Sequence, residues 1–213
     1  LVRMRKAGIR LPYFAMDATK KHSEVPVPDF TFHSYYKLRM ANSSWTHVAQ
    51  HLAFGSHAVP WEQRRRALMW RGVIRNSRMR AAIVPLLESL PAEALPVALD
   101  LREAAHGRGH SLLSKQCGAR YLLHLDGNSY SAGLKYKLAC GALVIRLRSP
   151  FAEFFEPGLV DGVHFVSLEA PNIWERNSSA FRERFHRELV PKLGAMLREL
   201  EGEIQRERRI KQA

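Results

Sequence analysis

Short apolar segments alternate with helix-forming segments through the middle of this 213-residue chain. Residues 66–71, 96–100, 121–125, 142–146 and 163–168 have the length and the Leu, Val and Ile content of buried β-strands. Helix-forming segments separate them at short spacing, which is the pattern of parallel strands joined by crossover helices. The sequence therefore predicts an α/β fold, a parallel sheet with helices on both faces.

Helices are expected between these strands and at the carboxyl end of the chain. The segments concerned are residues 42–51, 78–90, 112–119, 129–140 and 151–155. Asn76 or Ser77 caps the second of them, and Ser129 or Ser131 begins the fourth. From Ser179 onward, apolar residues recur every three or four positions, as on the packed face of a long helix.

The first 60 residues are expected to be irregular, because prolines interrupt them repeatedly. Residues 13–16 and 30–32 are short strand candidates within them. The chain starts with Leu rather than Met, so we interpret it as a fragment or an incomplete gene product. The missing targeting sequence therefore gives no information on the cellular compartment.

Composition limits the classes of protein to be considered. Hydrophobic residues make up 46% of the chain, which permits a sizeable core and argues against disorder. No apolar run reaches the ~18 residues of a membrane-spanning helix. The cysteines, Cys117 and Cys140, exclude a disulfide-scaffold fold and, without a CxxC pattern, are expected to be core thiols.

The positive charge is concentrated in the first third of the chain. The formal net charge is +13, and residues 1–80 hold 15 basic but only 4 acidic residues. Such an excess favours an anionic partner: a nucleic acid, a nucleotide phosphate or an anionic membrane. Arg64, Arg65 and Arg66 form the densest cluster, but no nucleic-acid-binding motif accompanies them. Nucleic-acid binding is therefore kept only as an alternative.

Two turns that follow predicted strands are suited to binding phosphate, because ligands bind at the carboxyl ends of strands in open α/β sheets. In the first, Arg71-Gly72 precedes a helix that carries Arg78 and Arg80. Glycine permits close approach of the backbone, and arginine forms paired hydrogen bonds with phosphate oxygens. The alternative is a turn whose arginines face solvent.

The second turn is Asp126-Gly127-Asn128-Ser129-Tyr130-Ser131. Serine hydroxyls and backbone N–H groups at the start of the next helix are expected to form an anion pocket. Lys135 lies one helical turn beyond Ser131 and is placed to neutralise a diphosphate, whereas Lys137 is less well aimed. A capped helix with nothing bound is the alternative.

Other candidate side chains carry weaker signals. Glu153 and Glu156 flank two phenylalanines just past a strand, where a carboxylate can accept hydrogen bonds from the hydroxyls of a ribose or pair with an arginine. His47 and His51 share a helix face but have no further ligand at metal-binding spacing, so no metal site is expected.

The segment Tyr121–Ser131, followed by Leu134–Gly141, resembles the core of the protein O-glucosyltransferases, which are members of glycosyltransferase family 90. The capsule-associated xylosyltransferases belong to the same family. Supporting segments occur in the family's order, so that the resemblance covers most of residues 11–168. They are residues 28–32 (PDFTF), 70–72 (WRG), 153–157 (EFFEP) and 162–166 (GVHFV).

This resemblance implies a two-lobed glycosyltransferase of the GT-B type, in which Rossmann-like domains face each other. Residues 1–60 would be a remnant of the acceptor-side lobe, 61–170 the Rossmann-like nucleotide-sugar-binding domain and 171–213 a carboxyl-terminal amphipathic helix. It further implies transfer from UDP-glucose or UDP-xylose to a hydroxyl of a protein or glycan acceptor, with inversion and without a metal ion or other cofactor. The implied location is the lumen of the endoplasmic reticulum or Golgi.

By the same resemblance, the donor would contact both turns. The implied residues are Arg71, Gly72, Arg80, Gly127, Asn128, Ser129, Tyr130, Ser131 and Lys135, with Glu153 and Glu156 as ribose candidates. Two positions depart from the family pattern: Gly133 replaces an arginine and Ala142 replaces a serine. The family's catalytic aspartate is expected at or before residue 1, so no catalytic residue is assigned in this chain.

Three hypotheses follow. The first is a glycosyltransferase similar to the protein O-glucosyltransferases, in a fragment without its general base. The second is a module that binds a UDP-sugar without catalysis. The third is the basic nucleic-acid-binding protein, which predicts binding that weakens steeply with salt.

Overall fold

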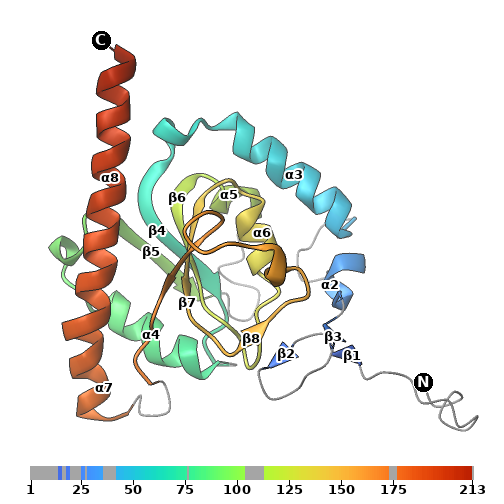
Figure 1. Cartoon of the computed structure of the whole chain (residues 1–213), viewed down its shortest axis with the longest axis horizontal. Coiled ribbons are helices and arrows are strands. Elements are labelled where there is room, and N and C mark those ends of the chain that lie inside the picture. The colour runs from blue at the N-terminus through green and yellow to red at the C-terminus, as the bar shows by residue number, and fades with distance from the viewer. Residues whose placement is uncertain are drawn as a thin grey trace, which may run out of the picture.

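A sheet of five parallel strands forms the centre of the molecule in this computed structural model (Figure 1). Its order is β5-β4-β6-β7-β9. The strands are β4 (Arg65–Gly72), β5 (Ala98–Glu103), β6 (Ala119–His124), β7 (Leu143–Leu147) and β9 (Val166–Leu168). The structure describes residues 14–15, 18–19, 25–26, 28–35, 42–75, 77–103, 113–172 and 177–212. The predicted α/β class and the parallel sheet are confirmed, and the arrangement is Rossmann-like.

The order of the strands reverses at β4. From β4 the chain passes through helix α4 (Arg78–Glu88) to β5 at the edge of the sheet, and then returns to β6 on the other side of β4. In open α/β sheets, the crevice outside the carboxyl ends of the strands at such a reversal is the usual ligand site. A ligand site is therefore expected at the loops after β4 and β6.

One face of the sheet is covered by α4 and by the carboxyl-terminal helix (Figure 1). That helix runs through α7 (Ser179–Arg184), a π-helical turn (Phe185–Leu189) and α8 (Val190–Gln212). Its apolar stripe is confirmed as a packing face, because Phe181, Phe185, Leu189, Leu193 and Leu197 are all buried in the core. The far end of α8 projects beyond the sheet (Figure 1).

A buried carboxylate fastens α8 to the sheet. Glu201 accepts hydrogen bonds from Arg120 at 2.9 Å and from the Tyr121 hydroxyl at 2.7 Å, and it pairs with Arg66 at 2.8 Å. Burial raises the pKa of Glu201, but the hydrogen bonds from Tyr121 and Arg120 outweigh it and leave the pKa below its usual value. A polar anchor inside an apolar interface fixes the register of the helix as well as its position.

The opposite face is covered by α3 (Trp45–Ala58), α5 (Leu113–Gln116) and α6 (Leu134–Leu138). Val48 and Leu52 of α3 pack with Met69 and Leu122 of the sheet. Helices therefore lie on both faces, as the alternation of segments predicts. None of the helices in the described part of the chain is long and apolar enough to cross a membrane.

The expectation of free core thiols is wrong, because Cys117 and Cys140 form a disulfide. Each cysteine lies a few residues before a strand, Cys117 before β6 and Cys140 before β7. These strands are neighbours in register, Tyr121 opposite Leu143, so their starting points lie side by side. The two α-carbons are 4.7 Å apart, within the range that a disulfide spans.

Three local expectations are also corrected. Residues 30–32 form part of a short helix, α2 (Phe30–His33), because Asp29 caps it by accepting the N–H of Thr31 at 3.0 Å. The expected helix at 151–155 is instead strand β8 (Phe151–Ala152), antiparallel to β2 (Ala18–Thr19), followed by a 3-10 turn at Glu156–Gly158. The helix expected from Ser129 or Ser131 begins only at Leu134.

The remaining elements match the expected positions with shifted ends. Ser77 caps α4, and the predicted strand at 13–16 appears as β1 (Phe14–Ala15), which pairs in parallel with β3 (Val25–Pro26). Short 3-10 turns occupy Trp61–Gln63 and Ala92–Ala94. Asn76 and Leu112, which the sequence analysis placed in helix ends, lie outside the described residues.

Reduction of the disulfide is expected to lower the free energy of unfolding by about 3 kcal/mol, because the bond closes a loop of sequence separation 23 in the unfolded chain. Urea unfolding with and without reductant measures the effect. The double variant Cys117→Ala/Cys140→Ala should be insensitive to reductant. Titration of two free thiols in the unreduced native protein would contradict the bond.

Candidate functional site

The loops after β4 and β6 are joined at the point where the strand order reverses. The hydroxyl of Ser77, at the start of α4, donates a hydrogen bond to the backbone carbonyl of Asp126 at 2.7 Å. The same oxygen accepts the N–H of Arg80 at 3.2 Å. One helix cap therefore fixes the start of α4 against the loop that follows β6.

Arg80 makes the second connection between these loops. Its guanidinium donates to the carbonyl of Val73 at 3.2 Å, to the carbonyl of Leu125 at 3.1 Å and to the hydroxyl of Ser131 at 3.0 Å. Burial lowers the pKa of Arg80, while the nearby carboxylate of Asp126 raises it, and arginine stays protonated in either case. The structure thus brings two predicted site residues, Arg80 and Ser131, into direct contact.

Arg71 is directed elsewhere. Its guanidinium donates to the carbonyls of Trp70 at 2.8 Å and Asp100 at 2.6 Å, and to Oδ1 of Asp100 at 2.7 Å. It therefore engages the edge strand β5, whereas Arg80 reaches the loop after β6. The sequence signal for this arrangement is Asp100, a charged residue at the end of the predicted strand 96–100.

The glycines of the two turns accommodate neighbouring protein groups. A Cβ atom at Gly72 would lie 2.6 Å from Cζ2 of the buried Trp70 ring, so the indole occupies the space of a side chain. A Cβ atom at Gly127 would lie 3.0 Å from the carbonyl oxygen of Tyr130. Of the rest of this loop, Asn128 is exposed and Ser129 half-buried.

The late start of α6 changes the expected anion pocket. A turn at Ala132-Gly133 separates Ser131 from the helix, and glycine is a poor helix former. The helix has only five residues, and the N–H of its first residue, Leu134, is already bonded to the carbonyl oxygen of Ser131 at 3.2 Å. The polar groups that remain at this loop are the hydroxyls of Ser129 and Ser131 and the guanidinium of Arg80, which reaches the loop from α4.

Lys135 is buried in a second polar cluster, beside the loop. Its Nζ donates a short hydrogen bond to the Thr31 hydroxyl and lies 3.6 Å from Oδ1 of Asp29 and 3.8 Å from Oε2 of Glu153. Burial lowers the pKa of Lys135, although the carboxylates of Glu153 and Asp29 oppose this. Lys135 was expected to neutralise a diphosphate, but its ammonium group is bound to Thr31 and lies close to two carboxylates of the protein.

Asp29 links the amino-terminal segment to the loop after β6. It accepts a hydrogen bond from the Tyr130 hydroxyl at 2.7 Å. Burial raises its pKa, but the hydrogen bonds from Thr31 and Tyr130 and the charge of Lys135 outweigh burial, and the pKa lies below its usual value. The predicted site residue Tyr130 therefore positions the loop by binding an ionised carboxylate.

The two ribose candidates have different surroundings. Glu156 accepts the backbone N–H of Glu153 at 2.8 Å with one oxygen and binds Arg146 with the other. Glu153 is only 2% exposed, and its Oε1 has no hydrogen-bond partner among the described residues. Burial raises the pKa of Glu153 to about 8, although Lys135 lowers it. Glu153 is thus the candidate whose carboxyl group is incompletely paired.

Sequence reasoning gave no site role to several buried polar groups here. His124 lies 3.2 Å from Oδ1 of Asp126, and burial together with the charge of Lys137 lowers the histidine pKa to about 4. Lys137 donates to the carbonyl of Leu123 at 2.6 Å, and burial and the charge of Arg80 lower its pKa to about 7. The sequence feature that could have indicated them is the presence of polar residues, His124 and Asp126, at the end of an apolar strand.

The whole arrangement suits a ligand that is anionic and rich in hydroxyl groups. Arg80 supplies positive charge and Ser131 supplies a hydroxyl at the reversal of strand order, and Glu153 supplies a carboxyl group in the neighbouring polar cluster. The part of the chain that the structure describes contains no group of three or more side chains able to hold a metal ion.

The family model of glycosyl transferase family 90 matches residues 2–183. The chain belongs to this family. Among curated proteins, "O-glucosyltransferase rumi" of Drosophila pseudoobscura pseudoobscura is 26% identical over 175 residues, which are 76% of this chain and 42% of that protein. The protein of the same name from Drosophila melanogaster is 25% identical over 179 residues, 75% of this chain and 41% of that protein.

A mammalian relative gives the same picture. "Protein O-glucosyltransferase 1" of Mus musculus is 23% identical over 175 residues, which are 75% of this chain and 44% of that protein. The chain therefore spans about two fifths of the length of the curated relatives it matches. Membership of family 90 confirms the resemblance seen in the sequence.

Gly72→Ala is expected to destabilise the protein by about 1–3 kcal/mol, because the new Cβ would overlap the buried Trp70 ring. Gly158→Ala is the matched control, since a Cβ there meets no atom within 4 Å. Its effect should stay within about 0.5 kcal/mol. Urea unfolding compares the two, and equal stabilities would refute the packing argument.

The pKa of Glu153 leads to a second expectation. In the folded protein it is about 8 instead of the ordinary 4.5, so between these values the folded state holds a proton that the unfolded chain releases. The stability from this group is complete below the ordinary pKa and is lost as pH rises toward the raised one. Glu153→Gln carries no such proton, so its stability relative to the wild type should increase from about pH 5 to about pH 8.

Urea unfolding at a series of pH values measures this difference. Glu183→Gln is the control, because Glu183 is an exposed residue of α7 with only a surface partner, Arg187. Its stability profile should run parallel to that of the wild type. A parallel profile for Glu153→Gln as well would show that this carboxyl is not held in its neutral form.

Proposed function

We propose that the chain binds the diphosphate of a UDP-sugar between the loops after β4 and β6, as the donor-binding part of a protein O-glycosyltransferase. The observation that carries the proposal is Arg80, which joins Val73, Leu125 and Ser131 at the reversal of strand order. Membership of glycosyl transferase family 90 and relatives named O-glucosyltransferases support the same function. In this proposal, the sugar passes with inversion to a hydroxyl group.

The diphosphate would be bound by the side chains that now hold the loops together. Arginine binds phosphate through two parallel hydrogen bonds, so Arg80 can exchange a neutral carbonyl acceptor for a charged oxygen. Ser131 can turn its hydroxyl toward the same phosphate. Lys137, whose pKa burial and the charge of Arg80 lower to about 7, can take up a proton when a phosphate approaches. In the proposal, side chains rather than a metal ion compensate the charge of the phosphates.

Glu153 is the proposed partner of the ribose hydroxyls. Within the part of the chain that the structure describes, its Oε1 lacks a hydrogen-bond partner, while its other oxygen lies 3.8 Å from Nζ of Lys135. A carboxyl that is protonated near neutral pH can both accept and donate a hydrogen bond, which suits a pair of hydroxyl groups. Lys135, Asp29 and Tyr130 then keep the loop in position rather than contact the phosphates.

The proposed domain division follows the sequence expectation of a GT-B enzyme. Residues 61–170 would form the donor domain, 171–213 the helix packed on it, and 1–60 part of the acceptor side. The hydrogen bond from Tyr130 to Asp29 supports a direct connection between the acceptor side and the donor loop. The names of the relatives favour UDP-glucose over UDP-xylose and a protein as acceptor.

The disulfide supports the proposed location in the lumen of the endoplasmic reticulum or Golgi. Disulfides persist in oxidising compartments and are rare in the cytosol. The bond between Cys117 and Cys140 is therefore in keeping with the secretory pathway.

Isothermal titration with UDP, UDP-glucose and UDP-xylose tests the proposal. Arg80→Ala and Ser131→Ala should each weaken UDP binding by about 1–3 kcal/mol, the usual contribution of a hydrogen bond to a charged group. Arg71→Ala should weaken it less, because that guanidinium is bound to Asp100. Arg187→Ala, an exposed arginine on the carboxyl-terminal helix, is the control and should change nothing.

The results separate the hypotheses. Absence of UDP binding by the folded chain would refute the donor site. Release of UDP from UDP-glucose in the presence of a hydroxyl acceptor supports the enzyme, whereas binding without release supports a non-catalytic binding module. Tighter binding of an oligonucleotide than of UDP, with steep loss in salt, would favour the nucleic-acid alternative.

A further inference from the structure

Strand β5 lies at the edge of the sheet. Within the described residues it pairs only with β4, from Ala98 opposite Ala67 to Glu103 opposite Gly72. It contains no proline, so every residue from Ala98 to Glu103 retains its N–H group. Alternate N–H and C=O groups of an edge strand point away from the sheet and can pair with another extended chain.

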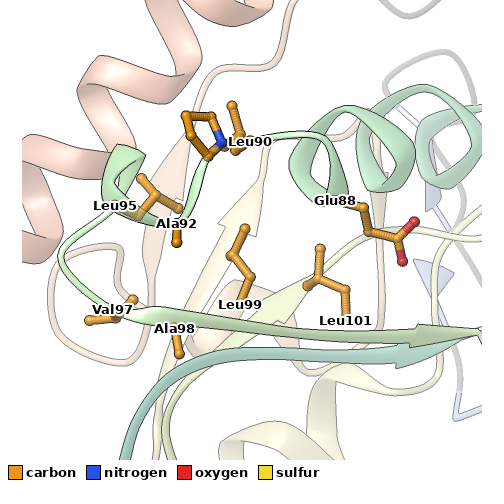
Figure 2. A pocket seen from close by; sticks show the side chains of 9 residues that line it. Glu88, Leu90, Ala92, Leu95, Val97, Ala98, Leu99 and Leu101 are labelled. Carbon is orange, nitrogen blue, oxygen red and sulfur yellow. The ribbon is translucent and has the colours of Figure 1, made fainter.

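An apolar hollow lies along one face of this edge. Leu99 and Leu101 rise from β5 toward the end of α4 and the loop that follows it, where Leu90 and Leu95 complete the wall (Figure 2). The hollow has a volume of about 390 Å³. The only charged residue in its lining is Glu88, whose carboxylate would repel an acidic side chain. The hollow therefore suits uncharged apolar side chains.

The opposite face of the same edge has an excess of positive charge. Asp100 binds Arg71 at 2.7 Å, Arg65 at 3.0 Å and Arg102 at 3.3 Å. Burial raises the pKa of Asp100, but hydrogen bonds from Arg65 and Arg71 outweigh it and keep the pKa below its usual value, so the carboxylate is ionised. The single negative charge of Asp100 is thus paired with three guanidinium groups, which leaves this cluster with a net positive charge. The side chains of Arg65 and Arg102 are 56% and 69% exposed.

The apolar hollow and the arginine-rich surface lie on opposite faces of the sheet along the same edge, so one added strand could contact both. Successive side chains of a strand point to opposite faces of the sheet. A segment that extends the sheet beyond β5 would therefore place every second side chain over Leu99 and Leu101, and the intervening ones beside Arg65 and Arg102. We propose that the edge of β5, unpaired within the described part of the chain, binds an extended protein segment in which apolar side chains alternate with aspartate or glutamate.

The charge also selects against a second copy of the chain. Antiparallel pairing of two β5 strands would bring both sets of Arg65, Arg71 and Arg102 together around two Asp100 carboxylates, which leaves a net repulsion. An acidic partner removes the same excess. This surface includes Arg71, which was predicted to contact the donor, but none of the residues that Arg80 binds, Val73, Leu125 and Ser131. The proposal therefore does not depend on the nucleotide site.

Fluorescence anisotropy with the 213-residue chain tests the proposal. The probe is a labelled peptide of about eight residues, the length of a typical strand, in which valine alternates with aspartate. A peptide with lysine in place of aspartate is its control. The aspartate peptide should bind, and the lysine peptide should bind at least roughly tenfold more weakly, because like charges would oppose it.

Variants on each face make the test specific. The double variant Arg65→Glu/Arg102→Glu should weaken the aspartate peptide at least roughly tenfold, whereas Arg187→Glu, an equally exposed arginine on another element, should leave it unchanged. Ala92→Glu, at the exposed rim of the hollow, should weaken binding, while Ala180→Glu on α7 should not. Thermal unfolding establishes that each variant is folded.

Other outcomes would overturn the proposal. One is no binding of the aspartate peptide to the folded wild type, and another is equal binding of both peptides. Peptide binding that survives both the arginine and the Ala92 changes would place the contact elsewhere. Self-association in sedimentation that Ala92→Glu abolishes would assign the edge to a second copy of the chain.

Discussion

The guanidinium of Arg80 lies between the loops after β4 and β6 and is hydrogen-bonded to both. Among the described residues, its acceptors are two backbone carbonyls and a hydroxyl, all of them neutral. A buried cation that is satisfied by dipoles keeps its net charge, and the low dielectric constant of the surroundings strengthens its field. The same contacts that hold these two loops together therefore also attract an anion, so stability and binding have a common origin.

A second set of buried charges positions the amino-terminal segment against this site. Lys135, Asp29 and Glu153 are each nearly inaccessible to water, and isolated burial of any one of them would be costly. Together with Thr31 and Tyr130 they compensate one another. Glu153 is the incompletely compensated member, which explains why its pKa rises while that of Asp29 falls. The group that the protein leaves unsatisfied is the one best suited to a ligand.

Local patterns in the sequence predicted the sheet, the helices on both faces and the capping of α4 by Ser77. They failed where contacts distant in sequence decide the outcome. The run Phe30–Phe32 has strand-like composition, but the cap at Asp29 and its contact with Tyr130 favour a helix. Arg71 lies at the carboxyl end of a strand, where a phosphate-binding residue would be expected, yet its partner Asp100 comes from β5. The pairing of Cys117 with Cys140 depends likewise on the register of β6 and β7.

The covalent link between Cys117 and Cys140 encloses β6, the loop with Tyr130 and Ser131, and α6 in a single ring. The cysteines lie at the amino-terminal ends of the strands, and the loop lies at the opposite rim. When a ligand binds, the loop can thus rearrange only within a segment whose two ends are held together by the disulfide. Reduction of the disulfide would widen the range of loop conformations, although the bond lies at the opposite end of the strands. The redox state of the surroundings would therefore govern how well the loop is ordered before a ligand binds.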